Sequence, residues 1–267
     1  KIFFINAVYI ISSIYLKIKL FEIMQKNVEK MTINYSPNFD LKKRDKKKIK
    51  YLIYHYTGMK NDKLAIKKLT SFNSNVSCHY YITKSGKLIQ MVPDLYVAWH
   101  AGESYWGNDK SINYNSIGIE ISNPGHGYGY RNFSDKQIKC LIRISKLIIK
   151  KYNIDKNKIL GHSDIAPLRK IDPGEKFPWK FLNKKKIGVW HNVSSEKLKS
   201  SRKKNSEENL SEFINYLKKI GYNIEYSNLN ELKKIIKVFQ MRFRPELVNG
   251  KLDLECFNIV KSLNNIK

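Results

Sequence analysis

The run Tyr51-Leu52-Ile53-Tyr54-His55-Tyr56-Thr57 is almost entirely apolar or aromatic and ends at Gly58. A short run of this kind, closed by a turn residue, is typical of a buried β-strand. A hairpin is indicated further along the chain, because Lys84-Ser85-Gly86 separates the apolar stretches 78–83 and 87–92. The chain therefore contains strands that can pair in one sheet.

A further strand is predicted over Ser116-Ile117-Gly118-Ile119-Glu120-Ile121. Its isoleucines alternate with Ser116, Gly118 and Glu120, so the two sets point to opposite faces of the strand. The small residues leave room above Glu120, as an active site needs. A solvated glutamate on an edge strand fits the same pattern.

Helical patterns lie between these strands. Apolar residues recur at helical spacing over 62–72, and Ser134 with Gln137 forms a capping box that opens a longer helix ending near Tyr152. Ile159-Leu160 predicts a short strand. This mixture of strands and helices, with one hairpin, predicts an α/β fold: a mixed central β-sheet flanked by helices.

The character of the chain changes near residue 183. Residues 183–205 are rich in lysine and serine, which predicts a linker. Helical patterns follow over 207–220, 230–243 and 253–263. We therefore expect a small C-terminal three-helix domain over 206–267.

Charge is the most extreme bulk property. Of 267 residues, 50 are Lys or Arg and 23 are Asp or Glu, which gives a formal net charge of +27. Such a charge suits nucleic acid, anionic lipid or an acidic polymer such as cell wall. The lysines are spread along the chain, which fits a compositional bias equally well and argues against a nucleic-acid patch. Cys78, Cys140 and Cys256 lie far apart, which argues against a thiolate zinc site or a disulfide framework.

The N-terminal segment 1–30 has two interpretations. Residues 2–16 are almost wholly apolar and flanked by lysines, which suits the core of a signal peptide better than a membrane span. Alternatively, translation begins at Met24 or Met31 and the segment is a mis-called start. The sequence leaves both open.

The stretch 161–174 concentrates reactive side chains. It holds His162, Lys170 and Asp172 between glycines and prolines, which predicts a loop, and loops on a rigid scaffold often carry function. With His55, it offers the imidazole and carboxylate donors of a hydrolytic zinc site. Taken singly, each residue also has a structural explanation: a core histidine, a turn residue or one more surface lysine.

Taken together, these pieces resemble the zinc-dependent N-acetylmuramoyl-L-alanine amidases, the family of the bacterial anhydromuropeptide amidases, phage T7-type lysozyme and the peptidoglycan recognition proteins. The pieces occur in the family's order, within an expected amidase domain over 31–182. They are Tyr54-His55-Tyr56-Thr57, Cys78-His79-Tyr80-Tyr81-Ile82, Ala98-Trp99-His100-Ala101-Gly102, the strand 116–121, the stretch 161–167 with Asp172-Pro173-Gly174, and Phe177-Pro178-Trp179.

The resemblance implies an activity and residue roles. The implied reaction is hydrolysis of the amide between N-acetylmuramic acid and L-alanine in peptidoglycan or muropeptides, in cell-wall turnover or recycling. His55, His162 and Asp172 are implied to bind one Zn²⁺, Glu120 to act as general base and Lys170 to stabilise the developing oxyanion. An aspartate at 172 matches the members with a His, His, Asp ligand set. Candidate substrate contacts are His79, His100, His126 and Trp179.

The C-terminal part carries a second resemblance. Its pieces 217–222, Val238-Phe239-Gln240 and 249–253 resemble a diverged peptidoglycan-binding domain. Joined to an amidase, such a domain is similar to the envelope members of the family, so we expect the periplasm or cell envelope, with the cytoplasm as alternative. The expected partner is peptidoglycan or muropeptide and not nucleic acid, with membrane contact only through 1–30. The alternative function is a non-catalytic peptidoglycan-binding protein of the same fold.

Overall fold

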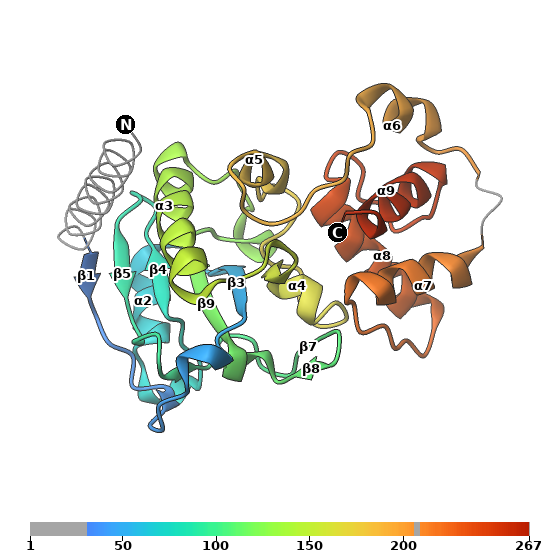
Figure 1. The fold of residues 1–267 in the computed structure, drawn as a ribbon. Coiled ribbons are helices and arrows are strands. Elements are labelled where there is room, and N and C mark those ends of the chain that lie inside the picture. Colours follow the sequence, from blue (N-terminus) through green and yellow to red (C-terminus); the bar gives the residue numbers. More distant parts are fainter. Residues whose placement is uncertain (1–30, 206–208, 267) are drawn as a thin grey trace, which may run out of the picture.

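A computed structural model describes residues 31–205 and 209–266, so the predicted N-terminal segment 1–30 lies outside the described residues. A six-stranded sheet forms the centre of the larger part (Figure 1), and β5 runs antiparallel to β4 while the other neighbours are parallel. The predicted mixed sheet and hairpin are therefore confirmed. In spatial order the strands are β1 (Met31–Ile33), β5 (Leu88–Gln90), β4 (Tyr80–Ile82), β9 (Ser116–Ile121), β3 (Tyr51–Tyr56) and β10 (Ile159–Gly161).

The two longest strands, β3 and β9, lie inside the sheet. Leu52, Ile53 and Tyr54 of β3 are fully buried. Parallel strands that are covered on both faces have nearly continuous apolar sequences, which explains the composition of β3. Their register pairs His55 with Glu120.

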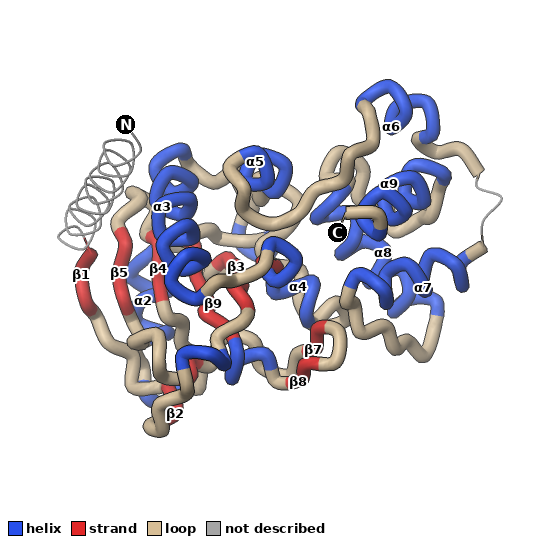
Figure 2. The backbone as a smooth tube through the Cα atoms, in the orientation of Figure 1, coloured by secondary structure: helices blue, strands red, loops and turns tan. Residues whose placement is uncertain are grey.

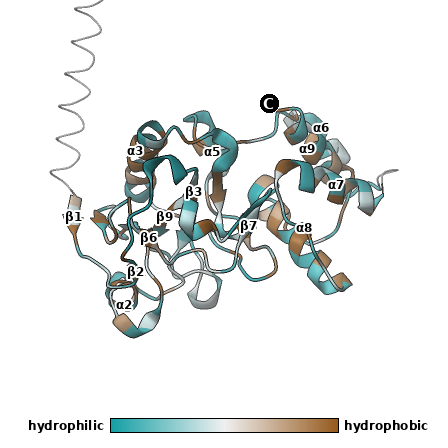
Figure 3. Ribbon diagram, turned by 60° about the horizontal axis from the view of Figure 1, so that its bottom comes forward, coloured by the Kyte–Doolittle hydropathy of each residue, from teal (hydrophilic) through white to brown (hydrophobic). Residues whose placement is uncertain are grey.

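Helices cover both faces of the sheet. In Figure 1, α3 (Asp135–Tyr152) lies in front of the sheet and α2 (Asp62–Leu69) lies behind it. The predicted capping box of Ser134 and Gln137 is present at the start of α3. The helix carries a hydrophobic and a hydrophilic face (Figure 3), and the apolar face packs into the core.

Smaller elements surround the sheet. β2 (Phe39–Asp40) pairs with β6 (Val97–Ala98), and β7 (Tyr105–Trp106) pairs with β8 (Asp109–Lys110). The stretch 161–174 differs from prediction, because it begins with a short helix, α4 (His162–Ile165), and only then becomes a loop. Within the described residues, no helix is long and apolar enough to span a membrane.

The three helices predicted at the C-terminal end are present as α7 (Leu210–Ile220), α8 (Leu229–Phe243) and α9 (Leu254–Asn264). We call residues 209–266 the C-terminal module. Three phenylalanine rings pack together inside it: the centroid of Phe213 lies 5.2 Å from that of Phe239 and 5.6 Å from that of Phe257. The module lies beside the sheet, with α4 between the two (Figures 1 and 2).

The segment predicted as a linker, 183–205, contains helical residues and a buried stretch as well as exposed chain. It contains the end of α5 (Trp179–Lys184) and the whole of α6 (Ser195–Ser201). Between these helices, Ile187, Val189 and Trp190 are buried in the same hydrophobic core that runs through the sheet and the C-terminal module. The segment that joins the two parts is therefore anchored to the core over residues 187–190.

Candidate active site

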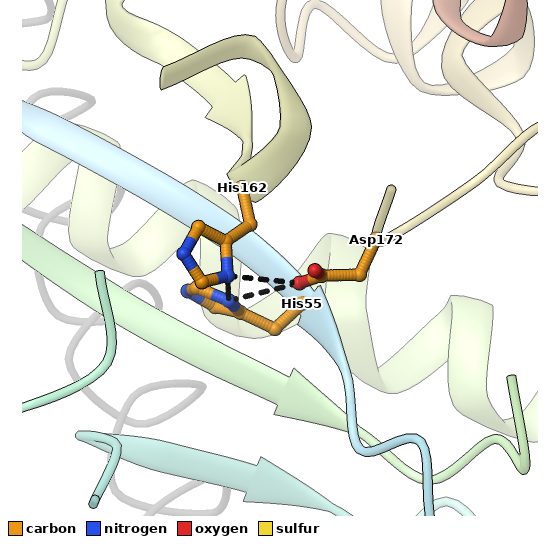
Figure 4. A group of neighbouring side chains, drawn as sticks. All are labelled: His55, His162 and Asp172. Atoms are coloured by element: carbon orange, nitrogen blue, oxygen red, sulfur yellow. Dashed lines mark hydrogen bonds and ion pairs between the residues drawn. The ribbon is translucent and has the colours of Figure 1, made fainter. Parts of the chain in front are cut away.

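Three side chains predicted as metal ligands converge at one edge of the sheet. His55 lies near the end of β3, His162 opens α4, and Asp172 lies in the loop that follows. The three point toward one another (Figure 4), with His55 Nδ1 2.9 Å from His162 Nδ1. Asp172 Oδ2 lies 3.1 Å from the first nitrogen and 3.2 Å from the second. One atom from each residue can therefore face a common point.

A chain of hydrogen bonds fixes the proton on His55. Ser116 Oγ donates to the carbonyl of Ile112 at 2.6 Å, since a carbonyl can only accept. The same Oγ then accepts from Nε2 of His100 at 3.1 Å, so Nδ1 of His100 accepts from Nε2 of His55 at 3.0 Å. Nδ1 of a neutral His55 is left as a free lone pair. Burial lowers the pKa of His55 to about 4, and a protonated His162 would act in the same direction, so His55 is neutral at neutral pH.

His162 is oriented in a similar way. Its Nε2 donates to the carbonyl of Ala101 at 3.0 Å, so Nδ1 of the neutral ring also carries a lone pair. Burial alone would raise the pKa of Asp172, but positive charge and N–H donation from protonated His162 and His55 rings would outweigh burial and hold that pKa well below its usual range. Two lone pairs and a carboxylate oxygen that face one another repel unless a cation lies among them. The arrangement therefore fits a metal cation, with the far nitrogen of each imidazole held by a hydrogen bond, to His100 for His55 and to Ala101 for His162.

Glu120 is placed beside this group by the register of β9 against β3. Its Oε2 is buried and has no hydrogen-bond partner among the described residues. Burial, with the negative charge of Asp172, raises the pKa of Glu120 to about 8, although Lys170 and Lys68 oppose the shift. A carboxylate with a pKa near neutrality suits proton transfer.

The room expected above the small residues of β9 is partly filled. A Cβ atom added at Gly118 would lie 2.4 Å from Cγ of His100. Gly118 therefore admits the His100 ring, and the open space lies further along, at Glu120.

A cleft of about 320 Å³ opens at this point. Glu120, His162 and Asp172 line it, and so does Lys170, as the sequence predicted for an oxyanion-stabilising residue. The sequence interpretation did not single out several other lining residues. They include the cations Lys68 and Arg169 and the apolar side chains Met59, Leu69, Val76 and Trp99.

The four candidate substrate contacts lie in different surroundings. Trp179 is 3% exposed and packs against Tyr54, Phe177 and Arg242. His79 is completely buried. Neither lines the cleft, and their burial argues against the predicted substrate contact for both. His100 does line the cleft, but both of its ring nitrogens are used in the chain from Ser116 to His55.

His79 and His126 have clear local partners. Nδ1 of His79 accepts from the backbone N–H of Gly118 at 3.0 Å, which joins the β4 and β9 segments beneath the cleft. His126 lies near the surface, where its ring nitrogens contact Tyr56 Oη and Glu175 Oε2, each at 3.0 Å. A substrate contact by His126 remains a prediction.

Comparison with known proteins agrees with this geometry. Residues 45–175 match the family model described as N-acetylmuramoyl-L-alanine amidase. N-acetylmuramoyl-L-alanine amidase AmiD of Escherichia coli is 35% identical over 230 residues, which cover 81% of this chain and 82% of that protein. AmiD has also been solved in complex with the substrate anhydro-N-acetylmuramic acid-L-Ala-D-gamma-Glu-L-Lys. That structure has a TM-score of 0.73 at 33% identity, and the match covers 81% of this chain and 88% of the AmiD chain. AmpDh3 of Pseudomonas aeruginosa, solved in complex with anhydromuramic pentapeptide, has a TM-score of 0.74 at 29% identity. The match covers 87% of this chain and 97% of the AmpDh3 chain.

Proposed function

Because this chain belongs to the N-acetylmuramoyl-L-alanine amidase family, we propose that it hydrolyses the amide bond between N-acetylmuramic acid and L-alanine in peptidoglycan or muropeptides. The observation that carries the proposal is the convergence of His55 Nδ1, His162 Nδ1 and Asp172 Oδ2, beside a cleft that also holds Glu120 and Lys170. The biological setting of this reaction is cell-wall turnover or recycling.

The cation that fits the three donors best is zinc. Two imidazole nitrogens and one carboxylate oxygen form a donor set that catalytic zinc uses, with a further position left for water or substrate. When bound, zinc would supply Lewis-acid chemistry, polarising the carbonyl and lowering the pKa of water. His55 lies behind the cleft wall at 1% exposure, whereas His162 and Asp172 line the cleft, so substrate would approach from their side.

Glu120 and Lys170 would carry the proton and charge steps. We assign Glu120 as the base that takes a proton from the attacking water and returns it to the leaving amine, because one of its oxygens has no other partner. Lys170 faces the same cleft, where its ammonium group would offset the negative charge that develops on the carbonyl oxygen.

The cleft also matches the chemistry of a muropeptide. Lys68, Arg169 and Lys170 give it a positive lining, which suits the carboxylates of a stem peptide, and Trp99 adds an aromatic surface. The AmiD and AmpDh3 complexes contain anhydromuramic peptides, which supports the same substrate class here.

We further propose a location in the periplasm or cell envelope. A net charge of +27 favours residence at an anionic wall, and peptidoglycan binding by the C-terminal module would hold the enzyme near its substrate. Membrane contact, in this proposal, is made only through segment 1–30.

The activity is tested by incubating the purified chain with a defined muropeptide, with zinc or with a chelator, and identifying the products by mass. Release of the free stem peptide only with zinc is the expected result. Tight binding of the muropeptide without any cleavage would instead establish the non-catalytic alternative.

A further inference from the structure

We propose that the C-terminal module is a structural part of the metal site, in which Arg242 and Tyr222 are positioning residues that act on His162 through Asp164. This inference rests on the proposed function for its biological meaning, but its test is metal binding. It differs from the role of a tethered wall-binding domain, for which only a connection to the enzyme is needed.

Asp164 lies two residues after His162 in α4 and is 1% exposed. Its Oδ2 accepts from the backbone N–H of Gly161 at 2.7 Å, which fastens the first turn of the helix. The adjacent N–H of Ser163 donates to the carbonyl of Asp172 at 2.8 Å. The turn that Asp164 holds therefore carries one proposed ligand and is bonded to another.

The other partners of Asp164 come from the C-terminal module. Arg242, near the end of α8, donates through Nη1 to Asp164 Oδ2, and Tyr222, just after α7, donates to Oδ1 at 2.6 Å. All three side chains are at most 3% exposed. A buried carboxylate that loses its cation is strongly disfavoured, so the position of α4 depends on the module.

Arg242 also contacts the segment that precedes α4. Its Nη2 donates to the carbonyl of Ile159 in β10 at 3.1 Å, and its guanidinium lies 4.3 Å from the ring centroid of Trp179. One side chain thus contacts the strand before His162 and the helix that contains His162. A shift of Arg242 would move both.

Tyr222 is held by a separate contact between the two parts. The backbone N–H of Gly107 donates to the carbonyl of Gly221 at 2.6 Å, and the ring of Trp106 packs edge-on against Tyr222 at 4.8 Å. Gly221 has φ of +131°, and a Cβ atom there would lie 2.6 Å from Trp106. The close approach therefore requires glycine at this position.

The test measures the zinc dissociation constant of the full chain by competition with a chelator. Arg242→Met and Tyr222→Phe remove the two donors with little change in volume, and Arg242→Lys restores a cation. Arg244→Met is the matched control, because Arg244 is also buried near the end of α8 but pairs with Asp253 and Glu255 inside the module.

We expect Arg242→Met to weaken zinc binding by about tenfold, the low end of the loss seen when a group that orients a metal ligand is removed. Tyr222→Phe should lose less, and Arg242→Lys should recover part of the affinity. Arg244→Met should lower the Tm but leave the zinc dissociation constant unchanged.

Two results would overturn the inference. One is a zinc dissociation constant that is unchanged in both Arg242→Met and Tyr222→Phe. The other is a loss of zinc affinity in Arg244→Met as large as that in Arg242→Met. If Arg242→Met does not fold, Tyr222→Phe decides, because it keeps the packed ring. Hydrolysis by the wild type is measured separately: a chain that binds zinc but does not cleave muropeptide contradicts the proposed function and leaves this inference standing.

Discussion

His55 and Glu120 are register partners on the neighbouring parallel strands β3 and β9. Register partners project their side chains to the same face of a sheet. One pair of strands therefore places a proposed metal ligand and the proposed base side by side. Because the two roles belong to different residues, substitutions can test metal binding and proton transfer separately.

Replacing Glu120 with Gln should abolish amide hydrolysis while zinc still binds, because the amide keeps the shape of the carboxylate but cannot accept the proton. We expect a loss in kcat of at least about a hundredfold, a typical contribution of general-base catalysis. Zinc content by elemental analysis and kcat on a muropeptide check this. Substantial activity in Glu120→Gln would remove Glu120 from the mechanism.

Replacing His100 with Phe should weaken zinc binding roughly 10- to 100-fold, because Nε2 of His55 loses the acceptor that orients its ring. Chelator competition measures the effect. His126→Phe is the control, since the hydrogen-bond partners of His126 are Tyr56 and Glu175 and not any of the three proposed zinc ligands. Equal zinc affinity in the wild type and His100→Phe would show that the hydrogen-bond chain does not orient His55.

Replacing Gly118 with Ala should destabilise the fold by about 1–3 kcal/mol, because the new methyl group would overlap the His100 ring, which hydrogen bonds hold at both nitrogens. Thermal or urea unfolding gives the change. Gly127→Ala provides the comparison, because a Cβ atom there meets nothing within 4 Å. A Gly118→Ala variant as stable as Gly127→Ala would contradict the packing described here.

Asp94 provides a pH-dependent contribution to stability. Burial acts to raise its pKa, but hydrogen bonds from Lys151, Tyr152 and Tyr80 outweigh burial and lower the pKa below its ordinary value of 3.8. Because the folded-state pKa is the lower one, the contribution is complete above pH 3.8 and is lost as the pH falls through the folded-state value.

Asp94→Asn should therefore lower the free energy of unfolding at pH 7 by about 1–3 kcal/mol, the cost of leaving buried partners unsatisfied. Its deficit relative to the wild type should shrink below pH 3.8. Urea unfolding at several pH values measures this, and a deficit that stays constant into strong acid would contradict the assignment.

The sequence predicted the parts of the fold that local patterns specify. β3, β9, the hairpin and α3 with its capping box all have periodicity or turn chemistry that acts over a few residues. The same is true of the C-terminal helices, where Asn209, Asn228 and Asp253 cap α7, α8 and α9 through their side chains.

Other features had no local signal. The helix α4 has four residues, too few to show a helical period, so the stretch containing His162 was predicted as a loop. Arg242 and Asp164 are 78 residues apart, and nothing near either one indicates the other. Trp179 is only a candidate substrate contact from the sequence, because aromatic residues serve in binding and in packing alike, and its burial favours packing.

The site was predictable as a set of residues but not as a hydrogen-bonded arrangement. His55, His162, Asp172, Glu120 and Lys170 meet as expected. The tautomers of the two histidines depend on Ser116, His100 and the carbonyl of Ala101, which only the folded chain brings together.

Anomalous diffraction at the zinc absorption edge, from crystals grown with zinc, tests the central claim most directly. A single strong peak within bonding distance of Nδ1 of His55, Nδ1 of His162 and a carboxylate oxygen of Asp172 is the predicted result. Absence of a peak there, or a zinc ion held through Nε2 of either histidine, would contradict the account.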